Sequence, residues 1–141
     1  IPAAVAVAGL DQPGGLALDS GGSNLYVAAA NSNAVTVFDR NENELDLGNF
    51  GSLTWLESRV DGVGGVDGLA GASDVVVSPD GFHVYATGEN DDAIAVFERD
   101  PLTGALAEFR ERKVDGAGAD GMAGPRAVAI SADSRTWSLP R

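Results

Sequence analysis

The sequence predicts an all-β fold made of β-propeller blades, each blade being a repeat of four antiparallel strands. Shifting the chain by 59 residues aligns residues 13–40 with residues 72–99 without a gap, and seven positions are identical. Each repeat holds four short runs of β-branched and aromatic residues bounded by Gly, Asn, Asp or Pro, which is typical of strands joined by turns. No segment has a 3.6-residue apolar period, so we expect little or no helix. Sequential four-stranded repeats indicate propeller blades, with a β-sandwich as the alternative.

The strands are expected in the same order in each repeat. The innermost strand is apolar throughout, which indicates burial on both faces, and is predicted at 16–18, 75–77 and 127–130. The second strand is predicted at 25–29 and 84–87, the third at 34–38 and 93–97, and the fourth at about 53–60 and 106–114. Charges on the fourth strand, such as Arg59 and Arg110, suit an exposed sheet edge.

The repeats define one propeller segment over residues 1–141. A second shift, of 53 residues, aligns 68–72 with 121–125. We therefore divide the chain into repeat 1 at about 9–67, repeat 2 at about 68–120 and a partial repeat 3 at about 121–141. The segment Ser78-Pro79-Asp80-Gly81 predicts a tight hairpin between the first two strands of repeat 2, because Pro sets φ and Gly accepts a left-handed conformation.

Composition excludes several classes of function. The 141 residues carry a net charge of -12 and a single lysine, Lys113, which opposes binding to nucleic acid or to an anionic membrane surface. The absence of cysteine excludes disulfides and thiolate metal sites, and it leaves the compartment open. No apolar stretch is long enough for a membrane-spanning helix, so no membrane insertion is expected.

The second repeat also carries a family resemblance. It reads SPDGFHVY at 78–85, DAIAVFERD at 92–100 and TGAL at 103–106. These motifs resemble blades of the lactonase-type seven-bladed β-propeller family and of surface proteins with YVTN-type repeats, over about residues 9–137. Repeat 1 departs from the pattern, with DSGG at 19–22, and repeat 3 departs further, with Ser138 where Tyr85 would recur. The resemblance specifies a blade, and it implies a lactone-opening chemistry only by analogy.

Two acidic glycine-rich loops are the candidate metal sites. They contain Asp61 and Asp67 in one loop and Asp115 and Asp120 in the next, at the crossing between repeats. Carboxylates on flexible backbone can bind Ca²⁺, the one cofactor considered, but a calcium loop needs more oxygen ligands than two per loop. We therefore favour connectors whose aspartates cap turns, and expect no cofactor.

Two further residues are candidates for ligand binding. In lactonase-like propellers the ligand cleft surrounds the central channel, so the resemblance implies that Asp74 and Arg126 line it. His83 is the only histidine and follows a hairpin turn, where an exposed strand residue is expected rather than a catalytic base. The catalytic residues are left unassigned.

Three function classes follow from these observations. The first is a non-catalytic propeller segment that serves as a binding or scaffold module in a larger extracytoplasmic or surface protein. The alternative is part of a lactonase-like hydrolase of the 6-phosphogluconolactonase type, which rests on the resemblance. The third is a calcium-stabilised adhesion module. The small-molecule or protein ligand is left open.

Closure of the ring gives the last expectations. Two and a half blades cannot close a ring of four to eight, so either the remaining blades of a longer parent chain or self-association must cover the exposed blade faces. An isologous dimer is one form, with residues 3–7 acting as a stray outer strand and 127–137 as the start of a new blade. We also expect Val76, Val128, Tyr85 and Phe97 to be heavily buried.

Overall fold

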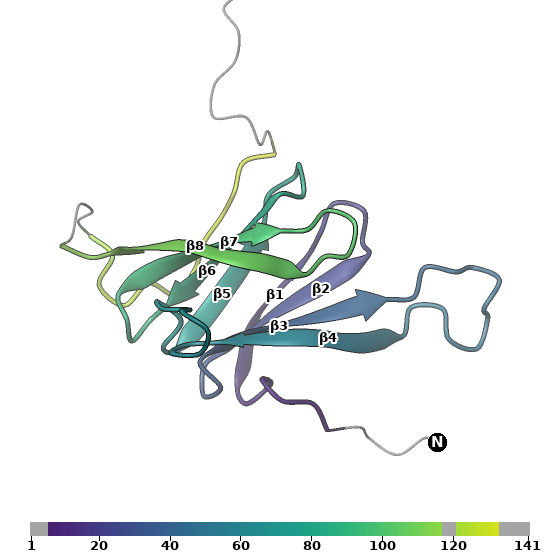
Figure 1. Ribbon diagram of the computed structural model, residues 1–141, viewed down its shortest axis with the longest axis horizontal. Helices are drawn as coiled ribbons and strands as arrows, with labels where there is room; N and C mark the ends of the chain where they lie inside the picture. The colour runs from purple at the N-terminus through teal and green to yellow at the C-terminus, as the bar shows by residue number, and fades with distance from the viewer. Residues whose placement is uncertain (1–5, 117–120, 133–141) are drawn as a thin grey trace, which may run out of the picture.

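The structure, a computed structural model, describes residues 6–116 and 121–132 and contains two four-stranded antiparallel sheets (Figure 1). Blade 1 consists of β1 (Pro13–Leu18), β2 (Asn24–Ala29), β3 (Ala34–Arg40) and β4 (Leu53–Val60), and blade 2 of β5 (Ala72–Val77), β6 (His83–Gly88), β7 (Ala93–Arg99) and β8 (Leu106–Val114). Neighbouring strands in each sheet follow one another in the chain. No described residue is helical, and accordingly none belongs to a helix that could cross a membrane. The predicted all-β blade architecture is confirmed.

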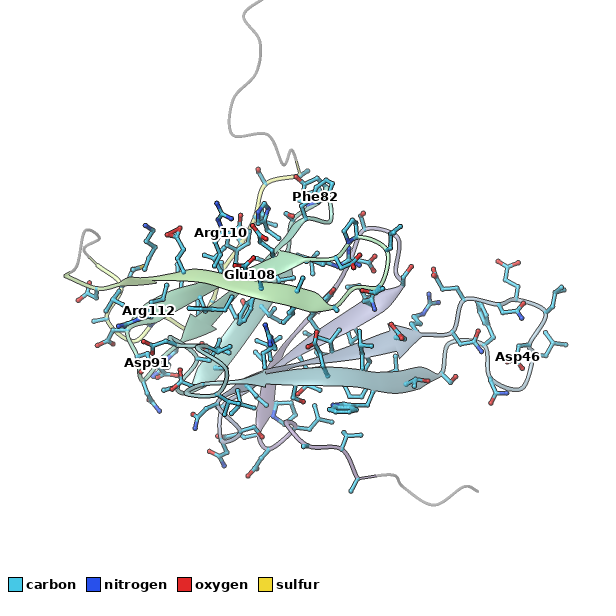
Figure 2. All side chains as sticks on the ribbon, viewed as in Figure 1. Asp46, Phe82, Asp91, Glu108, Arg110 and Arg112 are labelled. Carbon is cyan, nitrogen blue, oxygen red and sulfur yellow. The ribbon has the colours of Figure 1, made fainter. Side chains whose placement is uncertain are left out.

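The two blades repeat each other in detail. The first hairpin of each closes on a left-handed glycine, Gly22 at φ 77° and Gly81 at φ 81°. The innermost strands β1 and β5 have a bulge at the same place, next to Gly14 and Ser73. The charged outer edge is also present, since β8 exposes Glu108, Arg110 and Arg112 to solvent (Figure 2). Equivalent positions in the two blades can therefore be compared residue by residue.

The core lies between the blades. Alternate side chains of blade 1 point toward blade 2, among them Tyr26 and Val35, and meet Val75, Val84 and Phe97 of blade 2 in one buried cluster. We call the face of blade 2 that contacts blade 1 its front face, and the opposite face its back face. Blade 1 then contributes its back face to this core.

A buried arginine joins the two blades through polar contacts. Arg99, at the end of β7, has a side chain only 3% exposed. Its Nε donates to the Tyr26 hydroxyl at 2.5 Å, and its Nη1 donates to the Gly81 carbonyl at 3.0 Å. Its Nη2 donates to Asp19 Oδ2 and to Asn24 Oδ1, both at 3.0 Å. We call Arg99, Asp19, Asn24 and Tyr26 the inter-blade latch.

Burial gives Tyr26 a measurable effect on alkaline stability. Its hydroxyl is enclosed and donates to the Gly104 carbonyl at 2.6 Å. Burial raises the pKa of Tyr26 to about 12, against the lowering effect of the hydrogen bond from Arg99. Between pH ~10 and ~12 the unfolded chain therefore loses a proton that the native chain keeps, so the free energy of unfolding falls as pH rises.

We expect this fall to reach about 2 to 3 kcal/mol, at about 1.4 kcal/mol per pKa unit. Urea unfolding at pH values from 9 to 12 measures it. Tyr26→Phe should lose this part of the pH dependence, whereas Tyr85→Phe, at the half-buried equivalent position, should retain it. Equal slopes in the native protein and Tyr26→Phe would contradict the assignment.

The front face of blade 1 corrects one expectation. The innermost strand was predicted to be buried on both faces, but Leu16 is 66% and Leu18 is 53% exposed. Their equivalents Val75 and Val77 are buried in blade 2 because blade 1 covers them. Arg40 is the equivalent of Arg99 and donates likewise to a turn carbonyl, at Gly22, but no tyrosine of the described residues reaches it. That further blades or a second copy cover this face stays a prediction.

The back face of blade 2 corrects a second expectation. Phe97 is fully buried as predicted, but Val76, Tyr85 and Val128 are only half-buried and line an open groove. The predicted strand at 127–130 contacts β5 through the Val128 N–H, which donates to Asp74, yet it forms no ladder within the described chain. Residues 1–5 and 133–141, which include most of the proposed stray strand and the rest of the new blade, lie outside the described residues, and Ala6 and Val7 are not in a strand.

Candidate functional site

The innermost strands place three segments side by side: β1, β5 and residues 125–130. A Cβ built on Gly15 in β1 would lie 2.7 Å from Asp74 Cα in β5. On the other side of β5, the Val128 N–H donates to Asp74 Oδ2 at 2.9 Å. Blades of a propeller surround a central channel, and their innermost strands line it. Polar side chains on these three segments are therefore the ones that a ligand in the channel would meet.

Asp74 and Ser73 attach residues 125–128 to blade 2. The second oxygen of Asp74, Oδ1, accepts the Val75 N–H at 2.9 Å, so both oxygens of this carboxylate bind backbone amides. The Ser73 hydroxyl donates to the Pro125 carbonyl at 3.0 Å. Asp74 lies on the innermost strand β5, and its carboxylate binds the protein's own backbone. That it also lines the channel stays a prediction.

Arg126 projects from the segment held in this way. Its Nε lies 3.1 Å from Glu89 Oε1, and the two side chains are 79% and 36% exposed. Glu89 directly follows β6, in the turn that leads to β7. The pair therefore offers a cation and a carboxylate to solvent at one end of the innermost strands.

The connectors between blades share this end of the molecule. Asp61 Oδ1 accepts the Leu69 N–H at 3.0 Å, and Asp115 Oδ1 accepts the Met122 N–H at 2.8 Å in the next connector. The turn residues Asn33 and Asp92 repeat another pair of contacts, accepting the N–H of Gly71 at 2.8 Å and of Gly124 at 2.7 Å. These polar side chains replace the backbone partners that the glycine-rich connectors lack.

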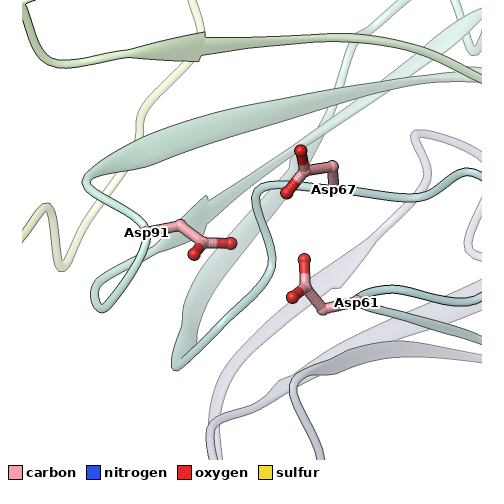
Figure 3. A group of neighbouring side chains, drawn as sticks. All are labelled: Asp61, Asp67 and Asp91. Carbon is pink, nitrogen blue, oxygen red and sulfur yellow. The ribbon is translucent and has the colours of Figure 1, made fainter.

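Three carboxylates come together beside the first connector (Figure 3). Oxygens of Asp61, Asp67 and Asp91 all lie within 4.8 Å of one another. Asp67 also pairs with Arg112 at 2.8 Å, and Asp91 Oδ2 accepts the Ala70 N–H at 3.0 Å. The cluster could offer three oxygens to a hard cation, whereas Ca²⁺ takes six to eight, and each carboxylate already has a partner.

The predicted metal residues are thus divided. The structure brings Asp61 and Asp67 together and adds Asp91, which lies in the β6–β7 turn. Asp115 lies in the following connector, and Asp120 lies outside the described residues.

Glu89 is the residue that sequence reasoning missed. In blade 1 its position is occupied by Ala30, under the 59-residue shift. Gly15 likewise stands where blade 2 has Asp74. A charged residue that replaces a small one between otherwise matching repeats was the available signal. Both departures lie next to the segment that carries Arg126.

His83 lies away from this group. It opens β6, whereas Glu89 follows the last residue of the same strand. A strand rises about 3.3 Å per residue, so nearly the full length of β6 separates the two. His83 lines a shallow pocket with Phe82, Glu98 and Arg99 and stacks obliquely near Tyr85, with ring centres 6.2 Å apart.

Comparison with known proteins identifies the family. The family described as "Lactonase, 7-bladed beta-propeller" matches residues 50–136. Among solved structures, the chain is similar to a candidate 6-phosphogluconolactonase from Bacteroides uniformis ATCC 8492, with 26% identity, a TM-score of 0.65 and coverage of 84% of this chain and 30% of that one. It is also similar to the periplasmic gluconolactonase of Pseudomonas aeruginosa, with 26% identity, a TM-score of 0.59 and coverage of 77% and 28%.

A third structure, a candidate 6-phosphogluconolactonase from Bacteroides fragilis NCTC 9343, shares the fold at 24% identity, with a TM-score of 0.66 and coverage of 85% of this chain and 29% of that one. No curated protein matches the chain. The chain spans less than a third of the length of the solved structures that it resembles. With a family match over more than half of its residues and two four-stranded blades, the chain belongs to the lactonase family of seven-bladed β-propellers.

Proposed function

We propose that the closed propeller containing these two blades hydrolyses a sugar lactone at the channel end where Arg126 and Glu89 meet. The observation that carries the proposal is the exposed pair between Arg126, on the third innermost segment, and Glu89, in the β6–β7 turn, in a lactonase-family chain. The similarity to two proteins named as lactonases supports it at 26% identity. These comparisons favour the hydrolase alternative over the non-catalytic scaffold that the sequence suggested first.

Lactone hydrolysis needs a base for water and a positive group for the developing oxyanion. In the proposed mechanism the Glu89 carboxylate takes a proton from a water molecule while the water oxygen attacks the lactone carbonyl carbon. The Arg126 guanidinium stabilises the negative charge that forms on the carbonyl oxygen. When the tetrahedral intermediate collapses, the ring C–O bond breaks and the leaving alkoxide takes the proton back from Glu89. The product is the open hydroxy acid.

The charge around the pair favours an uncharged lactone. Carboxylates at this end include Asp61, Asp67, Asp91 and Asp115, and the whole chain carries a net charge of -12. A phosphorylated lactone would meet this negative field, which raises the cost of its approach. We therefore propose an unphosphorylated aldonolactone as substrate.

The experiment is a lactone assay on the polypeptide that presents these blades in a closed ring. Hydrolysis of D-glucono-δ-lactone and of its 6-phospho derivative is followed by pH-stat titration, with the spontaneous rate subtracted. We expect turnover with the unphosphorylated lactone, and a loss of about 100-fold or more in kcat for Glu89→Gln and for Arg126→Gln. Arg110→Gln is the matched control. It removes an exposed arginine of β8 that pairs with Glu98 of β7, and it should keep full activity. Full activity in both test variants would reject the mechanism.

A further inference from the structure

The junction between blade 2 and the third innermost segment differs from the junction between blades 1 and 2. At the bulge of β1 the chain has Gly14 and Gly15, and β5 packs directly against this backbone, so that a Cβ on Gly15 would overlap Asp74. At the equivalent bulge of β5 the chain has Ser73 and Asp74. The junction between blade 2 and the third innermost segment is therefore made by side chains, whereas backbone makes the junction between blades 1 and 2.

These two side chains bind the segment at both sides of Arg126. Ser73 donates to the carbonyl of Pro125, the residue before Arg126, at 3.0 Å. Asp74 accepts the N–H of Val128, two residues after Arg126, at 2.9 Å. A second bond, between the hydroxyls of Ser73 and Thr87 at 2.8 Å, orients Ser73 from the neighbouring strand β6.

In the part of the chain that the structure describes, Ser73 and Asp74 supply the side-chain hydrogen bonds to the backbone of residues 125–128. Residues 125–130 form no strand ladder within the described chain. Arg126 itself is 79% exposed, so packing holds its side chain very little. The position of the guanidinium relative to Glu89 therefore depends on how firmly the backbone at 125–128 is held.

We propose that Asp74 and Ser73 are positioning residues that fix residues 125–128 and thereby hold the Arg126 guanidinium against Glu89. This inference rests on the proposed function, because it assigns these residues to the reaction through Arg126. In this role Asp74 acts through the backbone of the segment that carries Arg126, since its carboxylate accepts the Val128 N–H. A shift of about 1 Å in a group that stabilises a transition state is enough to lower the rate strongly.

The first test needs no activity and uses the chain as it stands. Amide hydrogen exchange at Val128 is measured by NMR in the native chain and in Asp74→Ala. Loss of a hydrogen bond from an amide to a charged acceptor should raise the exchange rate of the Val128 amide about 10-fold or more. Asp74→Asn keeps one carbonyl oxygen as an acceptor and should give an intermediate rise in the Val128 exchange rate. Ser73→Ala is a milder variant that should also raise this rate.

Asp100→Asn is the matched control. Asp100 likewise accepts backbone N–H groups, from Leu102 at 2.8 Å and Thr103 at 3.3 Å, but in the β7–β8 turn. It should leave Val128 exchange unchanged. Unchanged exchange in Asp74→Ala and Ser73→Ala, or an equal rise in Asp100→Asn, would overturn the proposal.

The second test is a double-mutant cycle in the lactone assay. Asp74→Ala should lower kcat about 10-fold or more with a smaller change in KM, and the double variant with Arg126→Gln should be no slower than Arg126→Gln alone, because Asp74 acts through Arg126. Additive losses would overturn the positioning role.

The two hypotheses fail in different ways. If Asp74→Ala frees Val128 and keeps full kcat while Arg126→Gln is inactive, the positioning role is wrong and the proposed function stands. If Arg126→Gln and Glu89→Gln both keep full activity, the proposed function is wrong, whatever Val128 exchange shows.

Discussion

Replacing Arg99 with leucine is expected to lower the free energy of unfolding by about 3 to 5 kcal/mol, because it leaves buried charges and dipoles without their partner. Asp19 would lose its ion pair at 3.0 Å, and Tyr26 and Asn24 would each lose a buried hydrogen bond. The loss is large against a total stability of about 5 to 15 kcal/mol for a typical domain. Urea unfolding followed by circular dichroism measures it.

Arg40→Leu is the matched control, since Arg40 occupies the equivalent position in blade 1, on the front face of that blade. Its side chain is 32% exposed and donates to the Gly22 carbonyl at 3.1 Å, with the ring of Phe50 5.7 Å away. We expect its replacement to cost about 1 kcal/mol, the value of an ordinary hydrogen bond. Similar losses in the two variants would show that the inter-blade latch adds nothing to the fold.

Phe97→Ala should cost about 3 to 5 kcal/mol, because it removes a large side chain from the centre of the inter-blade core. Phe97 is fully buried and meets Phe109 edge to face, with ring centres 5.6 Å apart. The space left behind lies between two sheets that other contacts hold together, so little collapse can fill it.

Phe82→Ala serves as the comparison, since Phe82 is 52% exposed in the β5–β6 turn. Its loss should change stability by no more than about 0.5 kcal/mol. Both variants are compared by thermal and urea unfolding of the same chain. A loss below about 1 kcal/mol in Phe97→Ala would place this aromatic pair outside the stabilising core.

The strands and turns could be predicted because their signals are local. Alternation along β3 and β7 and the hairpin glycines Gly22 and Gly81 depend on neighbours within a few residues. The bounds of β4 and β8 were also predicted, since turn residues flank both strands. Burial was predicted less well: Tyr85 and Tyr26 are equivalent in sequence, yet only Tyr26 is fully enclosed. Which of the two is covered depends on whether another blade lies against that face.

The candidate site shows the same division more sharply. Arg126 and Asp74 were proposed through the family resemblance, but the contact between Arg126 and Glu89 joins residues 37 positions apart. The approach of Asp91 to Asp61 and Asp67 likewise needs the turn of one blade to meet the connector that precedes it. No local period or motif in the sequence predicts contacts between residues so far apart in the chain.

The sequence by itself determined the four-stranded repeat, the strand order and the acidic surface, because side-chain alternation, turn chemistry and net charge act within one blade or on the whole chain at once. Only the tertiary structure decided that Arg99 is the buried link between blades, that Asp74 binds backbone and that Glu89 faces Arg126. Each of these depends on how one sheet lies against the next. That arrangement is set by packing between side chains distant in sequence, and equivalent residues acquire different roles according to which blade covers them.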